Sequence, residues 1–184
     1  MLFRSQAAES GRGIELRLYD INQLFNSMDP SPFREKDLDQ EAEEFIVGWA
    51  RDLHRHDPLS LTIYLGKPLE GAMRAETVTE AVHNHFNYLA EQAARQERRL
   101  LREGWKNLVI GLTFLSLCLF LAQLLDAYSG NTFVAILKEG MIIGGWVAMW
   151  RPMEIFLYSR WPIKHSQQLY TRLGSMDVRL AIYE

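Results

Sequence analysis

The fold is decided by residues 107–126, which read N-L-V-I-G-L-T-F-L-S-L-C-L-F-L-A-Q-L-L-D. Between Leu108 and Leu125 only Thr113, Ser116 and Gln123 are polar. As a helix this stretch rises about 30 Å, which is the thickness of the hydrocarbon core of a bilayer. A helix that is apolar on all sides could be buried in a soluble fold only inside a much larger protein. The sequence therefore predicts a transmembrane helix over residues 107–126.

A second apolar run covers residues 132–150 and follows a short loop at 127–131. So short a loop predicts an antiparallel hairpin of two transmembrane helices. Lys138 and Glu139 interrupt the second run, and ionisable groups within a span commonly mark a pathway or a partner. The Lys138 amine could instead reach the outer surface along its own stem, and Glu139 could be neutral or bonded to a neighbouring helix. Both interpretations are kept as alternatives.

Small residues recur every four positions in the second run, at Gly140, Gly144 and Ala148. On a helix this spacing makes a strip where another backbone can come close, on the side opposite Lys138. The first transmembrane helix could fill this strip within the chain. The pattern also predicts self-association through helix packing.

The charge beside the two runs predicts their orientation. Residues 95–106, interpreted as a basic stalk, carry five basic and two acidic side chains, and residues 151–184 carry five and three. The loop between the runs adds no basic residue. By the positive-inside rule both chain ends are cytoplasmic and the loop is external. Trp105, Trp150, Arg151 and Trp161 are expected to anchor the hairpin at the inner headgroup level.

The composition of the 184-residue chain, with its net charge of −3, excludes some classes of function. Residues 1–94 carry 9 basic and 16 acidic side chains, so this acidic region is unsuited to nucleic-acid phosphates. The single cysteine, Cys118, lies in the first apolar run, which excludes a disulfide framework and a cysteine-based metal site. The first ten residues contain no apolar core of the kind that an export signal requires.

Three short segments alternate between apolar and polar residues and predict strands at about 14–19, 59–65 and 178–183. Helices are predicted at about 38–53 and 75–94, and the single helix between the first two strands favours parallel pairing. The third strand follows both apolar runs, and no strand is stable alone. The predicted fold class is therefore an α+β membrane protein. Its two-helix hairpin is inserted into a small three-stranded α/β cytoplasmic domain that both chain ends close.

The segment after the second run, W-R-P-M-E-I-F-L-Y-S-R-W-P, contains Pro152 and Pro162, each of which is expected to open a short helix. The first of these helices is interfacial. The second is basic, covers about 163–173 and is expected to end at Gly174 as a C-cap.

The same segment resembles a family of uncharacterised bacterial inner-membrane proteins. The resemblance rests on Trp150, Arg151 and Pro152, on residues 154–158, on Trp161 and Pro162, and on S-P-F-R-E-K-D-L-D with E-A-E-E-F-I-V-G-W-A. It implies a bacterial cytoplasmic membrane and brings no activity.

The candidate chemistry of the sequence is sparse. His83 and His85 lie two positions apart on a helix and point in nearly opposite directions, so they cannot share a metal ion. His54 and His56 lie in a polar loop, and the glycines match no phosphate-binding spacing. Loop residues at the carboxyl ends of parallel strands could form a ligand cleft. Those residues are Asp20, Asn22, Asn26, Asp29, Arg34 and Lys67.

These observations favour a non-enzymatic integral membrane protein in the lipid bilayer, one that self-associates to a homo-oligomer or acts as a subunit or scaffold with a partner membrane subunit. Two alternatives remain open. The first is an oligomeric channel or transporter component that uses Lys138 and Glu139. The second is a membrane-anchored ligand sensor or enzyme that uses the loop cleft. The sequence predicts no cofactor, no metal and no nucleic-acid partner.

Overall fold

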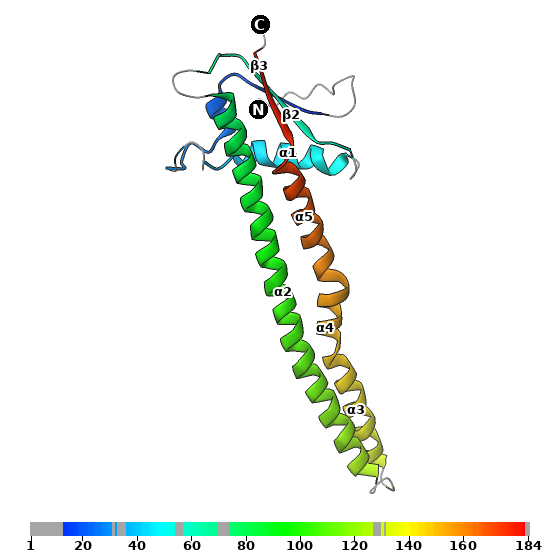
Figure 1. Ribbon diagram of the computed structural model, residues 1–184. Coiled ribbons are helices and arrows are strands. Elements are labelled where there is room, and N and C mark those ends of the chain that lie inside the picture. Colours follow the sequence, from blue (N-terminus) through cyan, green and yellow to red (C-terminus); the bar gives the residue numbers. More distant parts are fainter. Residues whose placement is uncertain are drawn as a thin grey trace. The chain divides into compact units, whose positions relative to one another are not determined.

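The computed structural model describes residues 13–30, 32, 36–53, 57–69, 74–126, 130 and 132–182. The chain divides into two compact units. The α/β unit contains the residues up to Gln92 together with those from Ser166 onward, and the hairpin unit contains Ala93–His165. Helix α2, Ala75–Asp126, contributes to both units as one unbroken helix (Figure 1). The helix predicted at 75–94, the basic stalk and the first apolar run are therefore one element.

The α/β unit contains a three-stranded parallel sheet in the order β1-β2-β3 (Figure 1). Strand β1 covers Ile14–Leu18, β2 covers Ser60–Leu65 and β3 covers Asp177–Ile182. The predicted sheet and the parallel pairing of its first two strands are confirmed. Central strand β2 pairs with β3 from Ser60↔Asp177 to Leu65↔Ile182. Parallel strands need a crossover connection, and the crossover from β2 to β3 contains the whole hairpin unit.

One face of the sheet carries the core of the unit. Alternate residues of β1 and β2 are buried, because successive side chains of a strand point to opposite faces. Helix α1, Gln40–Asp52, begins at its N-cap Asp39, whose carboxylate accepts the Glu41 N–H. Buried side chains of α1, of the first part of α2 and of α5, Arg160–Leu173, join the same cluster. Phe86 of α2 is among its largest fully buried side chains.

The opposite face of the sheet is polar and partly exposed. Register places Arg17 of β1 beside Tyr64 of β2, and the Arg17 guanidinium lies 5.8 Å from the centre of the Tyr64 ring. On β3, Arg179 pairs with Asp177 at 2.7 Å. The sheet is thus half-covered, although most parallel sheets are buried on both faces.

The hairpin unit contains helix α3, Thr132–Ala148, which follows α2 and is continued by α4, Trp150–Glu154. A five-residue π segment, Ile155–Ser159, then joins α4 to α5. Each helix begins two residues before its proline. Pro152 lies in the first turn of α4, where an N–H needs no intrahelical partner, whereas α5 continues the π segment directly, so Pro162 interrupts the hydrogen bonds of a continuing helix. The π segment replaces the break expected before Pro162. Pro162 cannot donate to the Tyr158 carbonyl, and the Ser159 hydroxyl donates to the Glu154 carbonyl at 3.4 Å.

Helix α5 ends at Leu173, as expected, but Gly174 is explained by crowding. A Cβ atom added there would clash with Oδ1 of Asn87, which belongs to α2. Gly174 also still donates its N–H to the Tyr170 carbonyl, as a helical residue does. The close approach of α2 therefore accounts for glycine at this position.

Candidate functional site

The hairpin unit is held together by a seam of mostly small residues. Gly104, Gly111, Leu115, Cys118 and Ala122 are buried on α2 at spacings of seven, four, three and four, which places them along one side of the helix. The spacing of seven between Gly104 and Gly111 was the signal in the sequence that could have revealed this seam.

Glycines make the closest contacts of the seam. A Cβ atom added at Gly111 would lie 3.0 Å from the carbonyl oxygen of Ala148, and one added at Gly145 would lie 2.8 Å from Cδ1 of Leu115. At Gly104 the nearest atom would be Cγ2 of Ile155, at 2.9 Å. The hairpin unit has two helical arms, which are α2 and the helical stretch that begins with α3. Larger side chains at these positions would push the two arms apart.

The predicted packing strip lies on another side of α3. Nothing lies within 4 Å of a Cβ atom added at Gly140 or Gly144, so the first transmembrane helix, which could have filled this strip, does not fill it at these two positions. A strip with a spacing of four drifts by about 40° per step around a helix, so Ala148 approaches the seam while Gly140 does not. Self-association through Gly140 and Gly144 stays a prediction.

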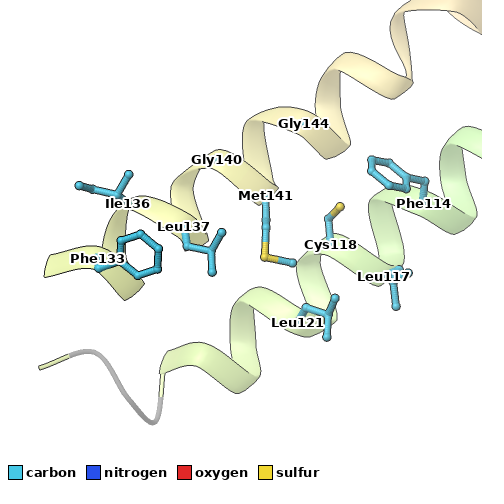
Figure 2. A pocket seen from close by; sticks show the side chains of 10 residues that line it. All are labelled: Phe114, Leu117, Cys118, Leu121, Phe133, Ile136, Leu137, Gly140, Met141 and Gly144. Atoms are coloured by element: carbon cyan, nitrogen blue, oxygen red, sulfur yellow. The ribbon is translucent and has the colours of Figure 1, made fainter. Parts of the chain in front are cut away.

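An apolar pocket of about 470 Å³ opens between α2 and α3 beside Gly140 and Gly144 (Figure 2). In Figure 2 the Met141 side chain reaches from α3 toward α2 on the side of Leu121. Every lining side chain is apolar or a thiol, so the pocket offers no charge or hydroxyl group for catalysis. The lining residues are Phe114, Leu117, Cys118, Leu121, Phe133, Ile136, Leu137, Gly140, Met141 and Gly144.

The two ionisable residues of α3 differ in exposure. Lys138 is half-buried and lies seven positions before Gly145, on the same side of the helix. Glu139 is exposed. A conduction role for these residues stays a prediction.

The expected anchors are all at the surface of the hairpin unit. Trp105, Trp150 and Trp161 are 62%, 72% and 73% exposed, and the Trp105 ring meets Phe156 edge to face at 5.9 Å. The Arg151 guanidinium forms an ion pair with Glu154 at 3.0 Å.

Most of the proposed ligand-loop residues stabilise their own turns. The Asp20 carboxylate caps the 3-10 helix η1, Ile21–Leu24, by accepting the Asn22 N–H at 2.8 Å. Asn26 accepts the Met28 N–H, and Asp29 accepts the Asp37 N–H at 2.7 Å.

The remaining candidates follow the ends of strands. The Lys67 ammonium lies 5.0 Å from the centre of the Tyr19 ring, just beyond β2 and β1. Arg34, like His54 and His56, lies outside the described residues. A ligand cleft at these loops stays a prediction.

A buried histidine, His85, is the polar centre of the α/β unit. The sequence did not indicate this role, because it showed His85 only as a possible metal ligand. His85 is 7% exposed. Its Nε2 atom lies 3.1 Å from Oε2 of Glu43. Its Nδ1 atom lies 3.3 Å from the backbone nitrogen of Leu38 and 3.1 Å from Oδ1 of Asp37. A ring with its proton on Nε2 donates to Glu43 and accepts from Leu38, whereas a doubly protonated ring donates to both carboxylates. Both nitrogens are engaged within the protein, so His85 positions α1 against α2. The described residues contain no cluster of three or more acidic, histidine or cysteine side chains that could hold a metal ion.

Replacing His85 by phenylalanine is expected to destabilise the α/β unit by about 1–3 kcal/mol, because the substitution leaves the Leu38 N–H and the half-buried Glu43 carboxylate without this partner. The effect on the free energy of unfolding is measured by chemical unfolding that is monitored through hydrogen exchange of the α1 amides. His83→Phe is the matched control, since His83 donates one bond from Nε2 to the Met176 carbonyl at 2.8 Å. Equal losses in the two variants would contradict the role assigned to His85.

The sequence matches no family model, no curated protein and no solved structure. The resemblance to bacterial inner-membrane proteins therefore stays a prediction.

Proposed function

We propose that the protein is a non-enzymatic membrane protein whose hairpin unit spans a bilayer and assembles with further copies or with a partner membrane subunit. The observation that carries the proposal is the exposure of apolar surface. Two helical stretches, Ala75–Leu125 and Thr132–Leu173, are long and apolar enough to cross a membrane. Only 22% of the most apolar part of the first stretch and 6% of that of the second are buried.

The low buried fraction of these two stretches argues against the chief alternative, which is that they are core helices of a soluble protein. A core helix of a soluble protein has the same composition but is covered by the rest of its fold. Here large apolar side chains are exposed on both arms away from the seam, and patches of this extent are rare on soluble monomers. The exposed side chains include Val109, Ile110, Leu112, Phe120, Leu124, Phe133, Ile136, Ile143, Trp146 and Val147.

Assembly is proposed from surfaces that the single chain leaves open. Gly140 and Gly144 border the apolar pocket and could admit the backbone of another helix. Strand β3 is an edge strand, and its residue Ile182 is 64% exposed. Edge strands and small-residue strips are both common contact surfaces. The basic residues beside the apolar runs favour a cytoplasmic location for both chain ends. The proposal that the membrane is a bacterial inner membrane depends only on the resemblance described above.

The proposal is tested by the behaviour of the full chain in membranes and detergent. Expressed protein should stay in the membrane pellet after alkaline carbonate extraction, because its apolar arms have no other cover. Native mass spectrometry at several protein concentrations should then give a defined homo-oligomer. Release into the supernatant would contradict the membrane assignment. A strict monomer would contradict self-association and leave the partner-subunit form, to be sought by gentle co-purification.

A further inference from the structure

The strongest unexplained charge in the molecule is a basic stripe on α2, formed by Arg95, Arg99, Arg102 and Lys106 with Arg98 beside it. These five residues are exposed. Their spacings of four, three and four place Arg95, Arg99, Arg102 and Lys106 on one side of the helix. This side points away from the seam, because Arg102 and Lys106 are each two residues, or about 200°, from Gly104.

Most of the stripe is not neutralised within the described chain. No acidic side chain of the described residues lies within ion-pair distance of Arg98, Arg99, Arg102 or Lys106. Two other cations of the unit do pair with acids: Arg160 pairs with Glu97 at 2.8 Å, and Arg151 pairs with Glu154 at 3.0 Å.

The stripe is also repulsive by itself. Arg95 and Arg99, Arg98 and Arg102, and Arg102 and Lys106 are like charges four residues apart, a spacing that destabilises a helix. An anionic partner would relieve this repulsion.

The position of the stripe favours one anionic partner. Lys106 directly precedes the apolar run of α2, and Trp105, which is 62% exposed, lies between Arg102 and Lys106. Exposed tryptophan beside an apolar span is typical of headgroup depth. A guanidinium also matches the phosphate group in its geometry, since its N–H donors can bind two phosphate oxygens at once.

We infer that the basic stripe binds the phosphate groups of anionic phospholipids at the membrane surface. This inference rests on the proposed membrane function. The headgroup layer is only about 5–8 Å thick on each side of a bilayer. Lys106 and Arg102 lie within about 6 Å of each other along the helix axis, whereas Arg95 lies about 16 Å beyond Lys106. Binding should therefore depend most on Arg102 and Lys106 and least on Arg95.

The test is a titration of the detergent-held full chain with phosphatidylglycerol or phosphatidylcholine, followed by native mass spectrometry. We expect clear preference for phosphatidylglycerol. Each of Arg102→Gln and Lys106→Gln should weaken its binding about fivefold, and Arg95→Gln should weaken it less. The matched controls are Arg51→Gln and Arg74→Gln, each of which removes one exposed cation from the α/β unit. Each control should bind the lipid as the unchanged chain does.

Three outcomes would overturn the inference. They are equal binding of the two lipids, equal losses in the stripe and control variants, and displacement of the lipid by a short oligonucleotide that binds more tightly. Carbonate extraction of the same proteins keeps the two proposals separate. A chain that stays in the membrane but shows no lipid preference contradicts only the basic-stripe inference. A chain that is extracted contradicts the membrane function itself.

Discussion

Ending the chain after Met176, so that β3 is lost, is expected to unfold the α/β unit. Strand β2 would lose one of its two pairing partners along its whole length, from Ser60 to Leu65, and would keep only β1. Val178 and Leu180, which pack against the core, would be removed as well. Two parallel strands do not form a stable sheet by themselves. The loss should therefore approach the entire stability of a small domain, about 5–15 kcal/mol.

Hydrogen exchange measured by mass spectrometry on the full membrane protein separates the two units. Amides of β1 and β2 should exchange fast in the shortened chain, while those of α2 and α3 within the hairpin unit stay slow. A chain ended after Ile182 keeps β3 and is the control. Continued protection of β2 without β3 would show that the C-terminal strand is dispensable and that the chain ends do not close one domain.

Elements that depend on local patterns were predictable from the sequence. The alternation of Ile14, Leu16 and Leu18 gives a strand wherever one face is buried, and β1 begins at the predicted residue. The third strand followed from the same pattern and from the instability of a lone strand. The cap of η1 could have been predicted too, because Asp20 and Gln23 have the spacing of a capping box.

Features that depend on how two helices meet were not predictable in the same way. Gly140 and Gly144 carry the familiar small-residue spacing, yet Gly145 is the glycine of α3 that packs against α2. One residue shifts a side chain by about 100° around a helix, so the choice depends on which side of α3 meets the seam. The polar contacts of His85 likewise join residues 42 to 48 positions apart, and no local pattern records them.

Replacing Gly145 by leucine is expected to open the hairpin, whereas replacing Gly144 by leucine is not. At Gly145 even a Cβ atom would lie 2.8 Å from Cδ1 of Leu115 and 3.3 Å from Cβ of Cys118, so the side chain has no room. Overpacking of this kind costs about 1–3 kcal/mol. For a chain of this size each kcal/mol lowers the melting temperature by about 2–4 °C. At Gly144 nothing lies within 4 Å of an added Cβ atom, and the glycine borders the apolar pocket.

Cys118 is a suitable probe for this pair of variants, because it is the single cysteine of the sequence and is buried against α3 beside Gly145. Labelling with a thiol-reactive dye on heating should begin at a lower temperature in Gly145→Leu and at the unchanged temperature in Gly144→Leu. Equal shifts would contradict the seam. The same two proteins also test assembly, since Gly144 borders the open strip. A smaller particle mass in Gly144→Leu with an unchanged labelling temperature would assign contacts between chains to Gly144 and contacts within the hairpin to Gly145.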